Sequence, residues 1–294
     1  MNFRLGTRGS RLALEQARRV AGQIRKLNPG LEVDLVVIKT SGDARSEFGD
    51  DIPAEIGEFS SALEKGLMQD EMDAAVHSAK DLPSRIHDSL VIGAYPERVD
   101  PRDAWVFRTG ENVSTGGWVG TESPRRRLFW GERWPQAKFR NIRGNIDRRM
   151  DRCLGEKDWQ GILLACAGID RLGGPTKGLE IERLDVNWMV PAPGQGALAV
   201  QCRKEDHRTL ELLRGLDNQK IRNCVSAEKS FLKTWGGGCS ESLGAFSQIQ
   251  PNGTLHLRAG VQDLFGRPQR ASIEGPQDEA DLLGVRLAEE MRRG

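Results

Sequence analysis

The amino-acid sequence predicts an α/β protein with two doubly wound units and a smaller α+β domain at its C-terminal end. Strand-like and helix-like patterns alternate through the first 95 residues, and they alternate again between about residues 102 and 190. Two segments rich in Pro and Gly, residues 96–101 and 190–196, join these regions. At 294 residues the chain is also too long for one hydrophobic core, so several domains are expected.

The first region begins with a strand over residues 3–7 and a helix over residues 10–27, in which apolar residues recur at helical spacing. Asn28-Pro29-Gly30 ends this helix. The near-continuous apolar run at residues 33–38 predicts a parallel strand buried on both faces. The remaining elements of this region are a helix over residues 59–67 and strands over residues 74–76 and 90–94.

The second region holds four strand-like segments, and a fifth follows the second crossing. They lie near residues 105–107, 118–120, 139–142, 162–165 and 197–202. Because the two crossings have similar composition, we expect the chain to leave the first domain, build the second and return. This predicts a discontinuous first domain (residues 1–96 and 197–215) and a second domain (residues 102–190).

The pattern changes from about residue 216. A helix over residues 219–235 is followed by a Gly-rich loop, three strand-like segments and a last helix over residues 279–291. This order of elements predicts a separate α+β domain over residues 216–294.

The composition limits the class of protein. Hydrophobic residues make up 38% of the chain and charged residues 29%, as in ordinary globular proteins, and 43 basic residues nearly balance 42 acidic ones. This balance argues against a nucleic-acid-binding protein. The first residues show no basic-then-apolar segment, and no apolar run reaches transmembrane length. We therefore expect a cytoplasmic protein with no nucleic-acid or membrane partner, and we take a monomer as its expected oligomeric state.

Neither the cysteines nor the histidines form a disulfide or metal-binding pattern. The five Cys are odd in number and widely spaced, without a C-x-x-C pair. The four His are scattered, without the spacing of metal ligands. We expect free thiols and no metal site.

Arginine stands at three predicted strand-to-helix junctions, where the free N–H groups of a helix N-terminus favour anions. At the first junction Arg8 precedes Ser10, a suitable N-cap. At the second, Ser123 precedes a helix whose first turn holds the three arginines 125–127, each opposing the helix dipole by roughly 0.3–1 kcal/mol. At the third, Arg149 lies near the start of a helix. A solvated basic face explains any one junction, but an anion ligand is the better explanation of all three.

Two residues are candidates for chemistry. Asp81 lies just after the strand at residues 74–76, where an Asp before a Pro turn commonly only ends a strand. Beside an anion cleft, however, this carboxylate suits the stabilisation of a developing cation and the relay of protons. Cys239 follows three glycines, which favour an accessible loop and a thiol that serves as an attachment point. The other four cysteines lie in apolar or helical stretches, as buried thiols do.

Seven segments resemble the hydroxymethylbilane synthase (porphobilinogen deaminase) family. They occur in the family's order and at nearly its spacing, over essentially the whole chain. These segments are residues 6–14, 75–83, 97–104, 143–145, 167–173, 193–197 and 237–239.

The resemblance implies a transferase that joins four porphobilinogen molecules head to tail, with loss of ammonia, and releases hydroxymethylbilane. It implies that the first two domains are periplasmic-binding-protein-like and enclose a cleft. A dipyrromethane cofactor, made from the enzyme's own substrate, is expected on Cys239 through a thioether. Asp81 is expected to assist the loss of ammonia and to stabilise the resulting azafulvenium.

The resemblance also implies which residues bind the acetate and propionate groups of cofactor and substrate. Those expected at the cofactor are Cys239, Lys80, Asp81, Ser123, Arg125 and Arg126. Those expected at the substrate are Arg8, Ser10, Arg149, Arg171 and Gln195. Each added pyrrole brings two carboxylates, so a growing chain needs an Arg-lined cleft and a fixed anchor.

The chain departs from the family pattern in two places. Glu55-Ile56-Gly57-Glu58-Phe59 stands where the family usually has Lys-x-Gly-Gly-Lys-Gly-Leu-Phe, so both lysines are lost. Residues 41–58 carry six acids and one Arg, which predicts an open, mobile loop that contributes little to holding an anionic chain. After Cys239, Ser240-Glu241-Ser242 replaces the usual Gln-Val-Pro.

Two other functions compete with this one. A non-catalytic relative that binds anions or tetrapyrrole precursors would explain the altered loop, but it would need neither Asp81 nor Cys239. RNA binding through the basic stretch 125–152 is weaker, because the chain has one Tyr, and Trp130 and Trp134 are spaced as a packed helix face.

Overall fold

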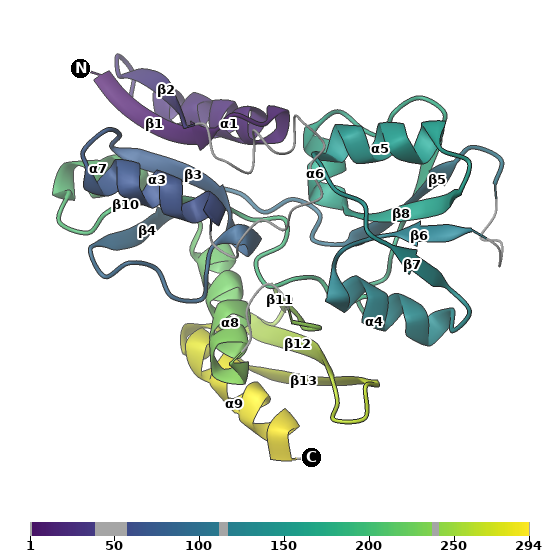
Figure 1. The fold of residues 1–294 in the computed structure, drawn as a ribbon. Helices are drawn as coiled ribbons and strands as arrows, with labels where there is room; N and C mark the ends of the chain where they lie inside the picture. The colour runs from purple at the N-terminus through teal and green to yellow at the C-terminus, as the bar shows by residue number, and fades with distance from the viewer. Residues whose placement is uncertain (1, 39–57, 112–116, 237–240, 294) are drawn as a thin grey trace.

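The computed structural model describes residues 2–38, 58–111, 117–236 and 241–293, which form two α/β units and a smaller C-terminal unit (Figure 1). The side chains of helix α3 are described from residue 62 onward. The acidic loop expected over residues 41–58 and the side chains of Glu55 and Glu58 lie outside this part of the chain, and so does Cys239.

The first unit is built on a five-stranded sheet in the order β2-β1-β3-β10-β4. Strands β1, β2 and β3 are parallel, whereas β10 is antiparallel to both of its neighbours. The bounds are β1 Asn2–Arg8, β2 Glu32–Ile38, β3 Ala74–Ser78, β4 Leu90–Ala94 and β10 Leu198–Arg203. Helices α1 (Arg11–Leu27), α3 (Glu58–Met68) and α7 (His207–Arg214) complete the unit.

Helix α1 begins and faces the sheet as its sequence predicts. The Ser10 side chain accepts a hydrogen bond from the backbone N–H of Ala13, which satisfies a free donor of the first turn. The buried residues recur every three or four positions, which places them on one face of the helix. They are Gln16, Ala17, Val20, Ala21 and Ile24.

The apolar run at residues 33–38 is buried less completely than its pattern predicts. Strand β2 is the edge of the sheet, and Val33 is its one fully buried residue. Leu35 is partly buried against one core, and Val36 and Ile38 pack against a second core on the other face. Both faces of β2 are therefore covered as expected. Its residues stay partly exposed because an edge strand has a neighbouring strand on one side only.

The second unit has a five-stranded sheet in the order β7-β6-β8-β5-β9. Strand β5 is antiparallel to β8 and β9, and the other pairs are parallel. The strands are β5 Asp103–Arg108, β6 Trp118–Gly120, β7 Lys138–Arg140, β8 Trp159–Ala165 and β9 Leu179–Arg183. The helices are α4 Pro124–Arg133, α5 Ile146–Gly155 and α6 Cys166–Arg171. The strand predicted at residues 139–142 is shorter, and Ile142 lies beyond it in the core.

The C-terminal unit packs two helices on a three-stranded antiparallel sheet, β11-β12-β13. Helix α8 (Gln219–Trp235) has the predicted bounds and ends at Gly236, whose φ of 79° suits glycine. Strands β11 (Gly244–Ile249), β12 (Thr254–Gln262) and β13 (Pro268–Pro276) lead to α9 (Ala280–Arg293). This is the smaller α+β unit that the sequence predicts.

The chain crosses twice between the α/β units, as the two Pro/Gly segments predict. After the second crossing β10 inserts between β3 and β4 of the first sheet. The two crossing segments lie against each other, because Leu198 donates a backbone hydrogen bond to Glu97 and Val99 donates one to Gly196. Two α/β units are joined in this way, while the expected division of the chain into domains stays a prediction.

Candidate active site

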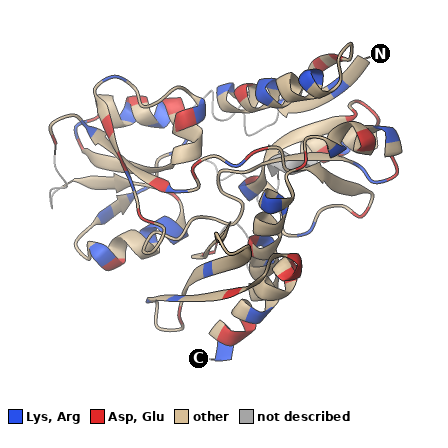
Figure 2. Ribbon diagram, turned by 180° about the vertical axis from the view of Figure 1, so that it is seen from behind, with Lys and Arg blue, Asp and Glu red and all other residues tan. Residues whose placement is uncertain are grey.

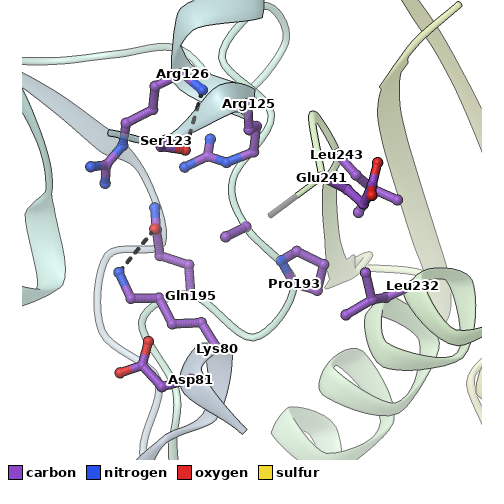
Figure 3. Close-up of a pocket in the computed structure, with 11 residues that line it drawn as sticks. Lys80, Asp81, Ser123, Arg125, Arg126, Pro193, Gln195, Leu232, Glu241 and Leu243 are labelled. Carbon is purple, nitrogen blue, oxygen red and sulfur yellow. Dashed lines mark hydrogen bonds between the residues drawn. The ribbon is translucent and has the colours of Figure 1, made fainter. Parts of the chain in front are cut away.

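A pocket lies where the two α/β units, the second crossing and the C-terminal unit meet (Figure 3). Its polar side chains are cationic, hydroxyl, amide and carboxylate groups, and its apolar ones come from the crossing and the C-terminal unit. The lining residues are Lys80, Asp81, Ser123, Arg125, Arg126, Ala192, Pro193, Gln195, Leu232, Glu241 and Leu243. The structure thus brings together every described residue expected at the cofactor.

Lys80 and Asp81 reach the pocket from the first sheet. They lie in a short 3-10 helix (Ala79–Asp81) that directly follows β3, at the carboxyl end of that strand. Asp81 is exposed at the pocket. Burial lowers the pKa of the Lys80 ammonium, and the neighbouring Asp81 carboxylate opposes that shift.

Gln195 bridges the two sides of the pocket. Its Oε1 accepts a hydrogen bond from Lys80 Nζ at 3.4 Å, and Figure 3 shows the amide between Lys80 and the two arginines. Its Nε2 donates to Asp103 Oδ1 at 3.3 Å and to the Pro101 carbonyl oxygen at 2.7 Å. Because an ammonium only donates and a carboxylate only accepts, these partners determine the orientation of the amide.

Arg125 and Arg126 in the first turn of α4 share one buried carboxylate. Arg125 Nη1 donates to Asp103 Oδ2 at 2.6 Å, and Arg126 Nε donates to Asp103 Oδ1 at 2.8 Å. Burial by itself would raise the pKa of the Asp103 carboxyl, but the two guanidinium groups hold it well below its usual range. The sequence predicted that this Arg-rich turn needs an anion, and Asp103 supplies part of that negative charge. Two guanidinium groups still outnumber this one carboxylate.

The other junction residues cap or pair within the chain. Ser123 is the N-cap of α4, and its hydroxyl accepts a hydrogen bond from the Arg126 backbone N–H at 3.4 Å. Ser10 caps α1 in the same way. Arg127 turns from the pocket toward the Thr121 carbonyl oxygen and the Asn141 side chain.

Arg149 extends the cationic surface beyond the pocket. Its Nε donates to the Gly144 carbonyl oxygen at 2.6 Å, which orients the guanidinium. Burial, together with the charges of Arg126 and Arg143, lowers its pKa to about 10, and the charge of Glu122 opposes that shift. A cation held among other cations is a suitable partner for an anionic ligand.

Four of the five residues expected at the substrate lie outside the pocket lining: Ser10, Arg149, Arg171 and Arg8. Arg171 is buried and donates to Glu97 at 3.0 Å and to the Gly196 carbonyl oxygen at 2.9 Å, so it fastens α6 to both crossings. Arg8 ends β1 and lies near enough to His77 for its charge to contribute to the lowered pKa of that imidazole.

Sequence reasoning missed Asp103 and the apolar lining. Asp103 begins β5, directly before the buried residues 104–106, and a carboxylate in so apolar a strand signals a buried cationic partner. Leu232 and Leu243 stand on either side of the Gly-rich loop in the sequence. Their place in the pocket could not be read from helical or strand periodicity.

The four described cysteines are poor nucleophiles. Cys153, Cys166, Cys202 and Cys224 are buried and free of disulfides. Burial raises the pKa of the thiols of Cys153 and Cys202 to about 11 and of Cys166 to about 12. A thiol that stays protonated at neutral pH does not form a thioether readily.

Within the described ranges, no group of three or more His, Cys, Asp or Glu side chains is arranged to hold a metal ion. Nor does any helix in that part of the chain have the length and apolar character needed to cross a membrane.

Comparison with known proteins gives full-length matches. The family model described as porphobilinogen deaminase, dipyromethane cofactor binding domain, matches residues 3–211, and that of the porphobilinogen deaminase C-terminal domain matches residues 222–293. A porphobilinogen deaminase of Brevibacillus brevis is 37% identical over 98% of this chain and 93% of its own length. That of Acidothermus cellulolyticus is 39% identical over 99% of this chain and 88% of its own. That of Thermus thermophilus is 37% identical over 98% and 94%.

Proposed function

The chain belongs to the porphobilinogen deaminase family, and from this premise we propose a role for each side chain of the pocket. Its activity is that of a transferase, which condenses four porphobilinogen molecules head to tail with loss of ammonia on a dipyrromethane primer and releases hydroxymethylbilane. The comparisons offer no support for a non-catalytic relative.

The donor set of the pocket fits a dipyrromethane. Lys80, Arg125 and Arg126 supply positive charge for its carboxylates, and the Ser123 hydroxyl adds a neutral donor. Pro193, Leu232 and Leu243 offer apolar surface for the faces of flat pyrrole rings. When bound, the group supplies the nucleophilic pyrrole carbon to which the next unit is joined.

Cys239 is the proposed anchor. It lies outside the described residues, but Leu232 and Glu241, which precede and follow it in the sequence, both line the pocket. The other four thiols are buried with raised pKa values, so Cys239 remains the one candidate among the five.

Asp81 is the proposed catalytic carboxylate. As the C–N bond of porphobilinogen breaks, the electron pair leaves with the amine and positive charge develops on the substrate. An exposed carboxylate at the pocket stabilises this charge and accepts the proton that is lost when the new C–C bond has formed. Lys80 beside it, held by Gln195, binds a carboxylate of the same ligand.

For the substrate, we propose that Arg149 binds carboxylates at the edge of the pocket. Gln195, which the resemblance also expects at the substrate, acts there by positioning Lys80, because its Nε2 already donates to Asp103 and Pro101. Arg8, Ser10 and Arg171 stay predictions from the resemblance, because the structure gives Ser10 a capping role and Arg171 partners within the chain. We also propose that the protein is a cytoplasmic monomer. Free, buried thiols suit a reducing compartment.

One observation carries this proposal: Asp81 lines the same pocket as Arg125 and Arg126, although they come from helices of different α/β units. The test is the Asp81→Asn variant, which should keep the fold and a covalent two-pyrrole adduct yet lose about 10²–10³-fold in turnover. Intact mass measures the adduct, and porphobilinogen consumption measures turnover.

The matched control is Cys239→Ser, which should lose the adduct mass altogether. A wild-type protein from porphobilinogen-replete cells that shows only the unmodified mass would contradict the anchor. Turnover of Asp81→Asn within a few-fold of wild type would reduce Asp81 to a residue that ends a strand.

A further inference from the structure

The helices of the second α/β unit carry Lys and Arg at several positions, which Figure 2 marks on the ribbon. Arg126 lines the pocket, and its charge and that of Arg143 both act on the pKa of Arg149. The guanidinium group of Arg149 therefore lies close enough to both for their charges to repel its own. Such a cluster needs a counter-ion.

Glu122 is placed as that counter-ion. Its Oε1 accepts a hydrogen bond from Arg143 Nε at 2.6 Å, and its charge opposes the lowering of the Arg149 pKa. Its backbone position is fixed, because it directly precedes the N-cap Ser123, whose backbone N–H donates to Thr121 Oγ1 at 3.1 Å.

Glu122 differs from Asp103 in its access to ligand. Asp103 is fully buried, and its two oxygens are taken by Arg125, Arg126 and Gln195. The Glu122 side chain is 33% exposed and that of Arg143 is 24% exposed, so a carboxylate arriving from solvent can displace this pair.

We infer that Glu122 limits how tightly the anionic chain is held, by competing with substrate carboxylates for Arg143 and Arg149. This inference rests on the proposed function and deepens it, because it makes Glu122 a specificity-determining residue of the same site. Each condensation adds two carboxylates, so binding tightens as the chain grows. Glu122, as a competitor within the protein, offsets part of this gain in affinity. Interactions that stabilise the bound substrate and the transition state equally do not raise turnover.

The experiment compares Glu122→Gln with wild type in two assays. The KM for porphobilinogen should fall about two- to fivefold, the range expected for a partly exposed ion pair, while kcat stays level or falls as release slows. Independently of activity, the rise in Tm caused by tricarballylate, a simple three-carboxylate probe, should be larger in the variant. Both effects should shrink at high salt.

Glu132→Gln is the matched control. Glu132 lies in the last turn of α4, roughly 15 Å along the helix, and is 40% exposed in its ion pair with Arg270. The substitution changes net charge equally, so KM and the tricarballylate response should remain at wild-type values.

Equal changes in both variants, or no change in Glu122→Gln, would overturn the inference. A wild-type protein without adduct or turnover would instead overturn the proposed function, and the tricarballylate arm would still measure the effect of Glu122.

Discussion

At the scale of single residues, Asp103 decides how the pocket presents its charge. Two guanidinium groups in one helix turn repel each other, and a buried carboxylate between them removes most of that repulsion. Two groups then face the ligand. One is the Arg125–Arg126 pair, whose combined charge Asp103 reduces to about +1, and the other is the Lys80 ammonium. Removal of Arg126 would leave the buried Asp103 carboxylate poorly compensated.

His77 provides a prediction for the dependence of stability on pH. It lies on β3 with 8% of its surface exposed, and burial, with the charge of Arg8, lowers its pKa from 6.5 to about 4. Between these values the unfolded chain binds the proton and the folded chain does not. The free energy of unfolding should therefore fall as pH drops from 6.5 to about 4, by at most about 3 kcal/mol.

Urea denaturation at pH 7 and pH 4.5 measures this effect. His77→Gln should lose less stability on acidification than wild type, because it has no imidazole to protonate in the unfolded state. The exposed His87 offers a control, and His87→Gln should keep the wild-type dependence. An undiminished loss in His77→Gln would assign the acid sensitivity to other groups.

At the scale of elements, strand β8 depends on the absence of a side chain at Gly161. A Cβ there would stand 2.4 Å from a ring carbon of Trp105 and 2.7 Å from the Val106 carbonyl oxygen. The neighbouring β5 strand and the fully buried indole leave little room to yield. Gly161→Ala should therefore lower the free energy of unfolding by about 1–3 kcal/mol or more.

Gly155→Ala is the control for this substitution. Gly155 is the last residue of α5, and a Cβ there would meet no atom within 4 Å. Alanine is the better helix former, so this variant should be unchanged or more stable by up to about 1 kcal/mol. If both variants were equally stable in urea, the packing of β8 against Trp105 would be looser than the structure shows.

At the scale of the whole molecule, Glu228 joins the C-terminal unit to both crossings. This fully buried carboxylate on α8 accepts hydrogen bonds from Arg98 at 2.8 Å, from the Gly194 backbone N–H at 2.7 Å and from Ser247. Gly194 lies between Pro193 and Gln195, which line the pocket. The position of these two lining residues therefore depends on a carboxylate of the C-terminal unit.

Glu228→Gln should lower the free energy of unfolding by about 3–5 kcal/mol, because it leaves Arg98 buried with no opposing charge and turns an amide NH₂ toward other donors. Urea unfolding and limited proteolysis at the crossings measure the loss. An Arg98→Leu, Glu228→Leu double variant should recover part of it. If Glu228→Gln lowered the free energy of unfolding by less than about 1 kcal/mol, hydrogen bonds without a charge would be enough to hold Arg98 and Gly194 in place.

By itself the sequence determined most elements and the residue types of the site, because these signals are local. Helical spacing predicted α1 and α8, caps predicted the starts of α1 and α4, and Pro/Gly segments predicted the two crossings. Strand β9 and helix α7 were not predicted, since both are short and their patterns are weak.

Only the tertiary structure decided which charges meet. Lys80 and Gln195 are 115 residues apart, and Gln195 and Asp103 are 92 apart, yet they form one hydrogen-bonded chain across the pocket. Local patterns carry no information about such partners, because the pairing is set by sheet order and by the two crossings. The sequence could therefore show that the arginines need an anion, whereas the fold decided that Asp103 and Glu122 supply part of it.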